Sequence, residues 1–404
     1  MEARGLPWRL DFLVIVNSCL MLFYHSTGLN MLGVLGNGIS AVMVAYLLIA
    51  SISSGYTWTR YGILLAFLIA SLGLTLMVNV GRTDPVDVLK FVSIFVAYLA
   101  GRISRQSLRI PWLSVVLLVG IPLLLLPFGS RIYYVSEGLG DLSFSYFMTR
   151  NAAVIYYTAV IFYLYSRLGR YSVPIQLLVA IAFGKIGAIL GSVAAYIIWN
   201  VRFDIRAIAL MAVGLIIGIV GFALGAFDRV FVVMGPLWSD LTNLGPERIS
   251  QMDYGDIALR TGSSDVSGYF RIKHWYNIWD IYSKCDYFQI IFGYGPGQTK
   301  IISDMKLVPH NDYLRILCEF GVANFILFIS IIIIALRNLE SNVLKSIFSV
   351  YVIYSMFDNL IDNFTSILML FGGAGLYAKH RVQPLTTRRA TDPSAHTIQG
   401  INWR

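Results

Sequence analysis

The sequence predicts an all-α polytopic membrane protein with about 12 transmembrane helices, and its composition is the first reason. Hydrophobic residues make up 57% of the 404 residues and charged residues only 13%, whereas a soluble domain of this length carries far more charge. The mean hydropathy is +0.69. Apolar runs such as 63–80, 111–128 and 205–227 are long enough to cross about 30 Å of hydrocarbon as helices.

Apolar segments recur along almost the whole chain. They cover residues 10–27, 31–52, 60–80, 86–103, 111–128, 149–168, 173–199, 205–227, 310–336, 341–357 and 360–378. Arg4 and Arg9 precede the first segment, and many spans follow it, so we expect a membrane anchor there rather than a cleaved signal peptide.

The basic residues fix the expected orientation. Arg4 and Arg9 at the amino end, and Lys379 and Arg381 at the other end, place both termini inside under the positive-inside bias. Two inside termini require an even number of crossings, so one of the eleven segments must divide. Segment 173–199 is interrupted by Gly-Lys-Ile-Gly at 184–187. We therefore predict two short spans here, with Lys185 at their outer turn, and twelve crossings in all.

This topology divides the chain into four regions. Residues 1–227 form amino-terminal spans, 228–309 a large external loop, 310–378 the last spans and 379–404 a basic cytoplasmic tail. Acidic and basic residues nearly balance in the external loop, so the net charge of +9 lies mostly in cytoplasmic loops and the tail. The charge therefore reflects topology, and we expect no nucleic-acid partner.

Cysteine spacing and loop aromatics give weaker indications. Cys19, Cys285 and Cys318 show no metal-ligand spacing, so neither a metal site nor a disulfide framework is expected. Aromatic side chains of the loop, such as Trp238 and Trp279, could stack on sugar rings or form the aromatic belt of the membrane interface. Both interpretations stay open.

Residues 268–279 predict the start of an amphipathic helix. Phe270 and His274 share one side of it, and Trp275 shares another. Arg271 lies near the helix start, where backbone N–H groups favour anions and a guanidinium offers paired donors for phosphate. Residues alone favour a plainer role, an ion pair of Arg271 with Asp265 or Asp280.

Three alternate glycines, Gly293, Gly295 and Gly297, surround Pro296. Glycine tolerates positive φ and close backbone approach, so this segment predicts a tight turn. No strand–helix unit surrounds it, which excludes a dinucleotide fingerprint. A turn before a re-entering helix is favoured over a ligand cradle.

His310 opens the next span. Asn311 and Asp312 occupy its first turn, where capping groups belong. Arg315 and Glu319 follow at helical spacing, and with Asp312 they predict a polar stripe. A lone histidine at a helix end is more often structural than catalytic, but ionic neighbours beside the only large external loop strengthen the catalytic interpretation.

These motifs together resemble the signature of the O-antigen ligase and Wzy-type O-antigen polymerase superfamily of integral membrane glycosyltransferases. The resemblance rests on Arg271 and Trp275, on Phe-Gly-Tyr-Gly-Pro-Gly at 292–297, on His-Asn-Asp-Tyr-Leu at 310–314 and on Glu-Phe-Gly at 319–321. The twelve-span plan with one large loop agrees over the whole chain.

The resemblance implies a GT-C-like membrane enzyme and assigns residue roles. A glycan would move from undecaprenyl diphosphate to an acceptor hydroxyl outside the bacterial inner membrane, with neither cofactor nor metal. His310 would be the general base and Asp312 its orienting partner, while Arg271 and Lys185 would clamp the diphosphate. Arg82 is a weaker clamp candidate, for which a snorkelling role is favoured.

Two features bear on that assignment. Arg150 and Asn151, just before a span, also match the family pattern. At the turn where the family commonly carries Ser-Arg, this chain has Gly184 and Lys185. Lysine keeps the positive charge of arginine but lacks the paired N–H donors of its guanidinium.

Several functions remain open from sequence. A polymerase of lipid-linked repeat units is favoured over a ligase that transfers glycan to lipid A-core. A transporter of lipid-linked glycan is disfavoured because no duplicated halves are visible, and a glycan-binding scaffold would lack turnover. Expected partners are the lipid-linked glycan, an acceptor glycolipid, membrane lipid and a chain-length regulator.

Overall fold

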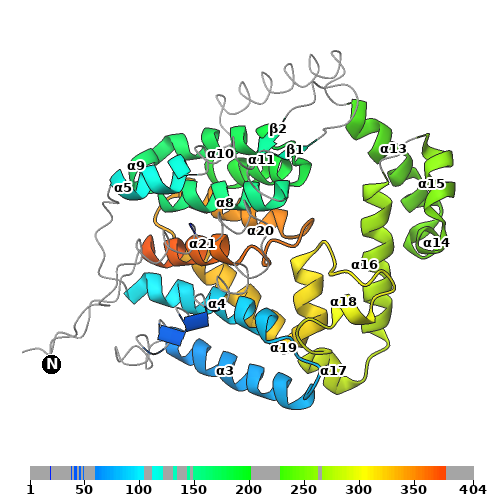
Figure 1. Ribbon diagram of the computed structural model, residues 1–404, viewed down its shortest axis with the longest axis horizontal. Helices are drawn as coiled ribbons and strands as arrows, with labels where there is room; N and C mark the ends of the chain where they lie inside the picture. Colours follow the sequence, from blue (N-terminus) through cyan, green and yellow to red (C-terminus); the bar gives the residue numbers. More distant parts are fainter. Residues whose placement is uncertain are drawn as a thin grey trace, which may run out of the picture.

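The computed structural model describes residues 60–103, 112–121, 131–133, 143–145, 149–201, 228–262 and 266–378, with isolated helical positions before residue 60. These residues are predominantly helical, as predicted (Figure 1). One short hairpin, in which β1 (Arg131–Tyr133) pairs antiparallel with β2 (Ser143–Ser145), was not predicted. Apart from those isolated positions, the predicted spans 10–27, 31–52 and 205–227 and the tail 379–404 lie outside the described residues.

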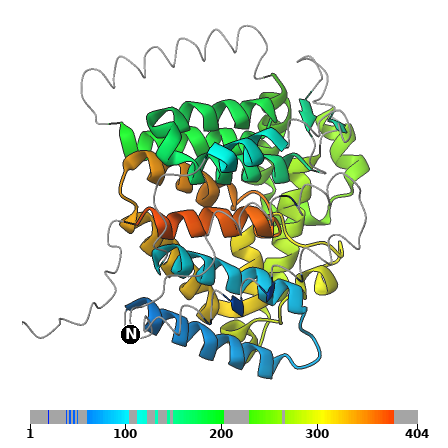
Figure 2. The same ribbon diagram turned by 60° about the vertical axis from the view of Figure 1, so that its left-hand side comes forward.

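The predicted apolar segments correspond to a bundle of helices that lie side by side (Figure 2). Its members are α3 (Arg60–Val78), α4 (Pro85–Ile103), α5 (Trp112–Val115) with η2 (Val116–Gly120), α8 (Arg150–Tyr163), α9 (Tyr165–Leu168), η3 (Gly169–Tyr171), α10 (Ser172–Ala182), α11 (Ile186–Asn200), α19 (Asp312–Asn338), α20 (Asn342–Tyr354) and α21 (Phe364–Leu376).

The predicted division of segment 173–199 is confirmed. Helix α10 ends at Ala182 and α11 begins at Ile186, and the two helices pack against each other. Gly184 has φ +59°, so it reverses the chain in a conformation that glycine adopts without strain. Lys185 stands in this turn, directly before α11.

Glycines bring the two central helices, α4 and α21, into backbone contact. A Cβ on Gly101 would lie 2.0 Å from the carbonyl oxygen of Gly372, and one on Gly375 would lie 2.1 Å from that of Tyr98. Small residues at such an interface let helix backbones approach closely. The core of the bundle forms around this pair.

The bundle has two distinct ends. At one end, Tyr377 accepts a hydrogen bond from the backbone of Ser166 (3.2 Å), and Leu339 forms a β-bridge with Ala378. The opposite end gathers the start of α8, the α3–α4 and α10–α11 turns, the segment before α19 and the loop between α20 and α21. The predicted site residues that belong to the bundle lie toward this second end.

By length and apolar composition, one helix among the described residues, α19, can cross a membrane by itself. The segments Arg150–Tyr163 and Tyr165–Ala182 would add a second crossing if this pair, bent by 64°, is one broken span. Four further apolar helices, among them α11, α20 and α21, are shorter. The predicted number of twelve crossings stays a prediction.

The predicted external loop folds into helices of its own, which stand beside the bundle (Figure 1). They are α13 (Asp228–Asn243), α14 (Gly245–Gln251), α15 (Tyr254–Thr261), α16 (Ser267–Ser283), α17 (Tyr287–Phe292) and α18 (Thr299–Ile302). Leu237, Ile249, Ile257 and Tyr269 form a small core among the first four. The helix predicted from residue 268 is thus confirmed as α16.

The glycine turn and α19 hold each other through their backbones. Gly321 breaks α19 with φ +76° and ψ 173°, which frees the carbonyl groups of Cys318 and Glu319 from helical partners. The N–H groups of Tyr294 and Gly295 bond to these carbonyls, at 2.9 and 3.0 Å. The predicted turn is confirmed, because Gly293, Gly295 and Gly297 all have positive φ.

Candidate functional site

His310 lies directly before α19, at the end of the bundle where the turns gather. Asn311 is the N-cap of α19, as predicted, and its side chain accepts a hydrogen bond from the N–H of Leu314 at 3.0 Å. The His310 side chain is 35% exposed, so this ring is open to a substrate while its backbone is anchored in the helix start.

Asp358, in the loop between α20 and α21, is the partner of His310. Its Oδ1 lies 3.2 Å from the His310 Nδ1, and its side chain is 3% exposed. Burial alone would raise the pKa of Asp358, but the His310 hydrogen bond and the charges of Lys185 and Arg271 hold the pKa below its ordinary value. An ionised Asp358 accepts the Nδ1 proton of a neutral imidazole and leaves the Nε2 lone pair available.

Two further side chains, Lys185 and Tyr354, lie close to this carboxylate. The Nζ of Lys185, in the α10–α11 turn, lies 3.9 Å from the other oxygen of Asp358. The hydroxyl of Tyr354 lies 3.5 Å from that oxygen and donates to Asn151 Oδ1 at 2.9 Å. The structure therefore brings the predicted Lys185 to the predicted His310, through a carboxylate that the prediction did not include.

Arg271 approaches the same group from α16. Its charge acts on both Asp358 and Tyr354. The alternative ion pair with Asp280 is absent, because Asp280 pairs with Lys284 at 2.6 Å; Asp265 lies outside the described residues. Within the described chain Arg271 makes no salt bridge, and its Nε is buried without a hydrogen bond. This guanidinium remains available to an anion.

One side of α16 also faces His310. The Phe270 ring meets the His310 ring edge-on, with 5.8 Å between centroids, and meets the His274 ring at the same distance. His274 is fully buried. Burial, and then the neighbouring His310, lower the pKa of His274, so it adds no positive charge at neutral pH.

The predicted role of Asp312 is corrected. Asp312 is fully buried, and its Oδ2 accepts the N–H groups of Leu360 and Ile361 at 3.0 and 3.1 Å. These two bonds join the Asp312 side chain to the α20–α21 loop, and the described contacts do not join it to His310. Asp312 fixes the loop that carries Asp358, and Asp358 contacts the histidine.

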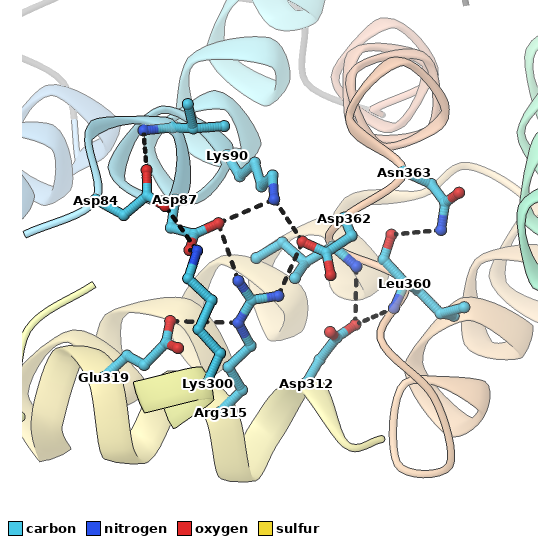
Figure 3. A network of polar contacts seen from close by, with 12 residues as sticks. Asp84, Asp87, Lys90, Lys300, Asp312, Arg315, Glu319, Leu360, Asp362 and Asn363 are labelled. Atoms are coloured by element: carbon cyan, nitrogen blue, oxygen red, sulfur yellow. Dashed lines mark hydrogen bonds and ion pairs between the residues drawn. The ribbon is translucent and has the colours of Figure 1, made fainter. Parts of the chain in front are cut away.

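The predicted polar stripe is one part of a larger ion network (Figure 3). Arg315, 3% exposed, lies 3.2 Å from Glu319, 2.9 Å from Asp87 of α4 and 2.9 Å from Asp362 before α21. Lys90 lies 2.9 Å from Asp87 and 2.5 Å from Asp362. The buried charges of these ion pairs thus have opposite charges beside them, as a stable buried network requires, whereas Asp312 accepts backbone N–H groups instead.

The network extends to the glycine turn. Lys300, just after the turn, lies 2.8 Å from Asp84 of the α3–α4 connection, and the Thr299 hydroxyl donates to Glu319. A Cβ on Gly297 would lie 2.6 Å from the Asp84 Cβ. The glycines therefore allow the turn to pack closely against the α3–α4 connection, which agrees with a structural turn rather than a ligand cradle.

Arg82 lies in the α3–α4 connection and is exposed. Its backbone carbonyl accepts the side-chain amide of Gln298. The described contacts do not bring its guanidinium to His310 or Asp358, so the structure adds no support for Arg82 as a diphosphate clamp.

Sequence reasoning missed Asp358 and Asp362 although a signal was present. The stretch Asp-Asn-Leu-Ile-Asp-Asn at 358–363 places two carboxylates between apolar segments, where an ionisable group usually has a functional or paired role. In the twelve-span topology Asp358 lies in the outer turn between spans 341–357 and 360–378, on the same side as His310, and Asp362 lies at the outer end of the last span.

Comparison with protein-family models and with curated proteins finds no match for this chain. The chemical capacity of the site therefore rests on its geometry. A carboxylate-oriented histidine can accept a proton, and an arginine and a lysine beside it can hold a negatively charged group. The described residues contain no group of three or more metal-ligating side chains suited to an ion.

Proposed function

We propose that this chain is an inverting glycosyltransferase of the bacterial inner membrane that polymerises undecaprenyl-diphosphate-linked repeat units into a surface polysaccharide. One observation carries the proposal: a carboxylate-bound histidine and two cations from segments far apart in sequence meet at one end of an apolar bundle. The sequence resemblance supplies the reaction, and this geometry offers the groups that the reaction needs.

Membrane insertion is supported by the outer surface of the bundle. Large apolar side chains are exposed on α3, such as Phe67 (64%) and Met77 (74%), and on α10 and α11, such as Leu178 (64%) and Ile198 (65%). Water disfavours such extended apolar surfaces, whereas lipid tails solvate them. The site end would then face the periplasm, and the end with Arg102 would face the cytoplasm.

The proposed reaction is a single displacement. The oxygen of an acceptor hydroxyl attacks the anomeric carbon of the donor, its proton passes to Nε2 of His310, and the bond from the anomeric carbon to the diphosphate oxygen breaks. Asp358 stabilises the imidazolium that forms, in the manner of a general base held by a carboxylate. Attack opposite the leaving group inverts the anomeric configuration.

Arg271 and Lys185 would stabilise the leaving group. Charge accumulates on the diphosphate as its bond to the sugar breaks, and cations held in place for that charge lower the barrier. Because the lipid diphosphate already activates the donor, the proposal requires neither nucleotide nor metal.

The test is turnover of lipid-diphosphate-linked repeat units by the purified protein, with His310→Ala as the variant and Leu259→Ala, on the exposed surface of α15 (85% exposed), as the matched control. We expect longer lipid-linked chains from the wild type and the control and a loss of about 10²-fold or more in His310→Ala. Product that forms only after a lipid A-core acceptor is added would indicate a ligase. No product with either acceptor would contradict a glycosyltransferase.

A further inference from the structure

Helix α17 carries an apolar face that nothing in the described chain covers. Tyr287 is 84% exposed, Phe288 66% and Ile291 45%. Positions 287, 288 and 291 share one side of a helix. The other side is anchored, because the Ile290 carbonyl accepts a hydrogen bond from Tyr282 and the helix ends at Gly293 against α19.

This face adjoins the exposed apolar side of α3. Helices α17 and α3 are in contact, and Asn79, at the end of α3, donates a hydrogen bond to the carbonyl of Gly293, at the end of α17 (3.2 Å). Met77 in the last turn of α3 is 74% exposed, and Val80 just after its end is 80% exposed. The apolar surface of the bundle therefore extends onto α17 at the end that carries the site.

The dimensions of α17 exclude a crossing. Its six residues extend about 9 Å as a helix, against about 30 Å of hydrocarbon. Its cap Asp286 and the nearby Lys284–Asp280 ion pair are exposed, so the amino-terminal side of α17 is polar. A short helix with one polar boundary and one aromatic face matches the interfacial zone of a bilayer, where tyrosine and tryptophan concentrate.

We propose that α17 lies in the outer interface of the membrane, with Tyr287, Phe288 and Ile291 inserted among lipid headgroups and the upper acyl chains. The partner is the lipid surface itself, and the argument for it is the continuity of this face with the exposed side of α3. This inference rests on the proposed membrane location of the bundle. It ties the glycine turn, which follows α17 directly, to a fixed depth near the bilayer surface.

The test is the depth of a spin label at Phe288→Cys in the full chain without its native cysteines, reconstituted in lipid nanodiscs. The matched labels are Phe67→Cys, on the exposed side of α3, and Leu259→Cys, on α15 of the external segment. Collision with oxygen reports lipid, and collision with a water-soluble nickel chelate reports water. We expect a ratio of oxygen to nickel collisions at residue 288 that is several-fold above that at 259 and approaches that at 67.

The other outcomes separate the two proposals. A label at 288 as accessible to nickel as that at 259, while 67 stays in lipid, overturns the interfacial placement alone. Shielding of 288 from both reagents indicates a protein that covers α17, which also overturns it. Nickel access at 67 as well as 288 removes the membrane location on which both proposals depend.

A second measurement on the wild-type chain avoids dependence on cysteine variants. Hydroxyl-radical footprinting in nanodiscs gives the oxidation rate of each side chain relative to the denatured chain. Protection of Tyr287 and Phe288 several-fold above that of Leu259 supports lipid burial, and equal protection contradicts it.

Discussion

The His310 group and the Arg315 network occupy the same end of the bundle but balance their charges differently. Around Arg315, the carboxylates of Asp87, Glu319 and Asp362 surround a nearly inaccessible guanidinium. Around His310, one buried carboxylate, Asp358, faces Lys185 and Arg271, and the histidine ring stays partly exposed.

The difference separates a scaffold from a site. Buried charges that neutralise one another hold helices together and offer little to a ligand. Among the described residues Arg271 makes no salt bridge, and it lies beside a partly exposed histidine, so its charge can attract an incoming anion. Four substitutions or conditions would break or sharpen this comparison.

The largest expected effect is on the Arg315 network. Arg315→Met leaves three carboxylates around an apolar side chain, and loss of one partner from a buried ion pair costs about 3–5 kcal/mol. We expect a loss of that order in the free energy of unfolding, measured in detergent by chemical denaturation. The control Lys284→Met removes an exposed pair with Asp280 and should leave stability nearly unchanged, because solvent screens such a pair. Equal effects would contradict the scaffold role.

Asp358→Asn should affect turnover more than it affects stability. An amide does not stabilise the imidazolium, so we expect kcat to fall by about 10²-fold or more with little change in KM. Asp280→Asn, an exposed carboxylate of α16, is the control. A loss confined to KM would instead assign Asp358 to substrate binding.

Gly321→Ala tests the break in α19. Gly321 has φ +76°, and an added Cβ would lie 2.3 Å from the carbonyl oxygen of Ile291. We expect a destabilisation of about 1–3 kcal/mol, seen in the same denaturation experiment. Gly73→Ala in α3, where nothing lies within 4 Å of the added Cβ, should be neutral or stabilising by up to about 1 kcal/mol.

The smallest expected effect is the pH dependence of stability from Asp358. Its pKa is lower in the folded chain than in the unfolded one, so its contribution is present above the unfolded value of about 3.9 and is lost as pH falls through the folded value. The stability difference between wild type and Asp358→Asn should therefore shrink below about pH 4. A difference that stays constant with pH would contradict an ionised, stabilising Asp358.

Local features could be predicted because local chemistry decides them. Apolar runs gave the helices α3, α4, α19, α20 and α21 within a few residues. The glycines at 184 and 187 indicated the division of segment 173–199, since a flexible turn is cheap there. Asn311 was identified as a cap, and His310 as the open residue at the helix start.

Partner choice could not be predicted, because it depends on which chain segments meet. Asp312 is close to His310 in sequence, but it is Asp358, 48 residues further along the chain, that contacts the histidine. The α20–α21 loop folds back toward the start of α19, and its Leu360 and Ile361 N–H groups bind Asp312 instead. The glycines at 293, 295 and 297 likewise predicted a turn, but they did not predict that its N–H groups would bond to the carbonyls of Cys318 and Glu319 in α19.

The sequence by itself therefore determined the apolar helices, their turns and the residue types capable of the chemistry, since these follow from hydrophobicity and backbone propensity along a short stretch. The tertiary structure alone decided which opposite charges pair and that the histidine ring stays partly exposed. The electrostatic energy of a buried charge depends on the distance to charges from other helices, and those distances exist only after the bundle has formed.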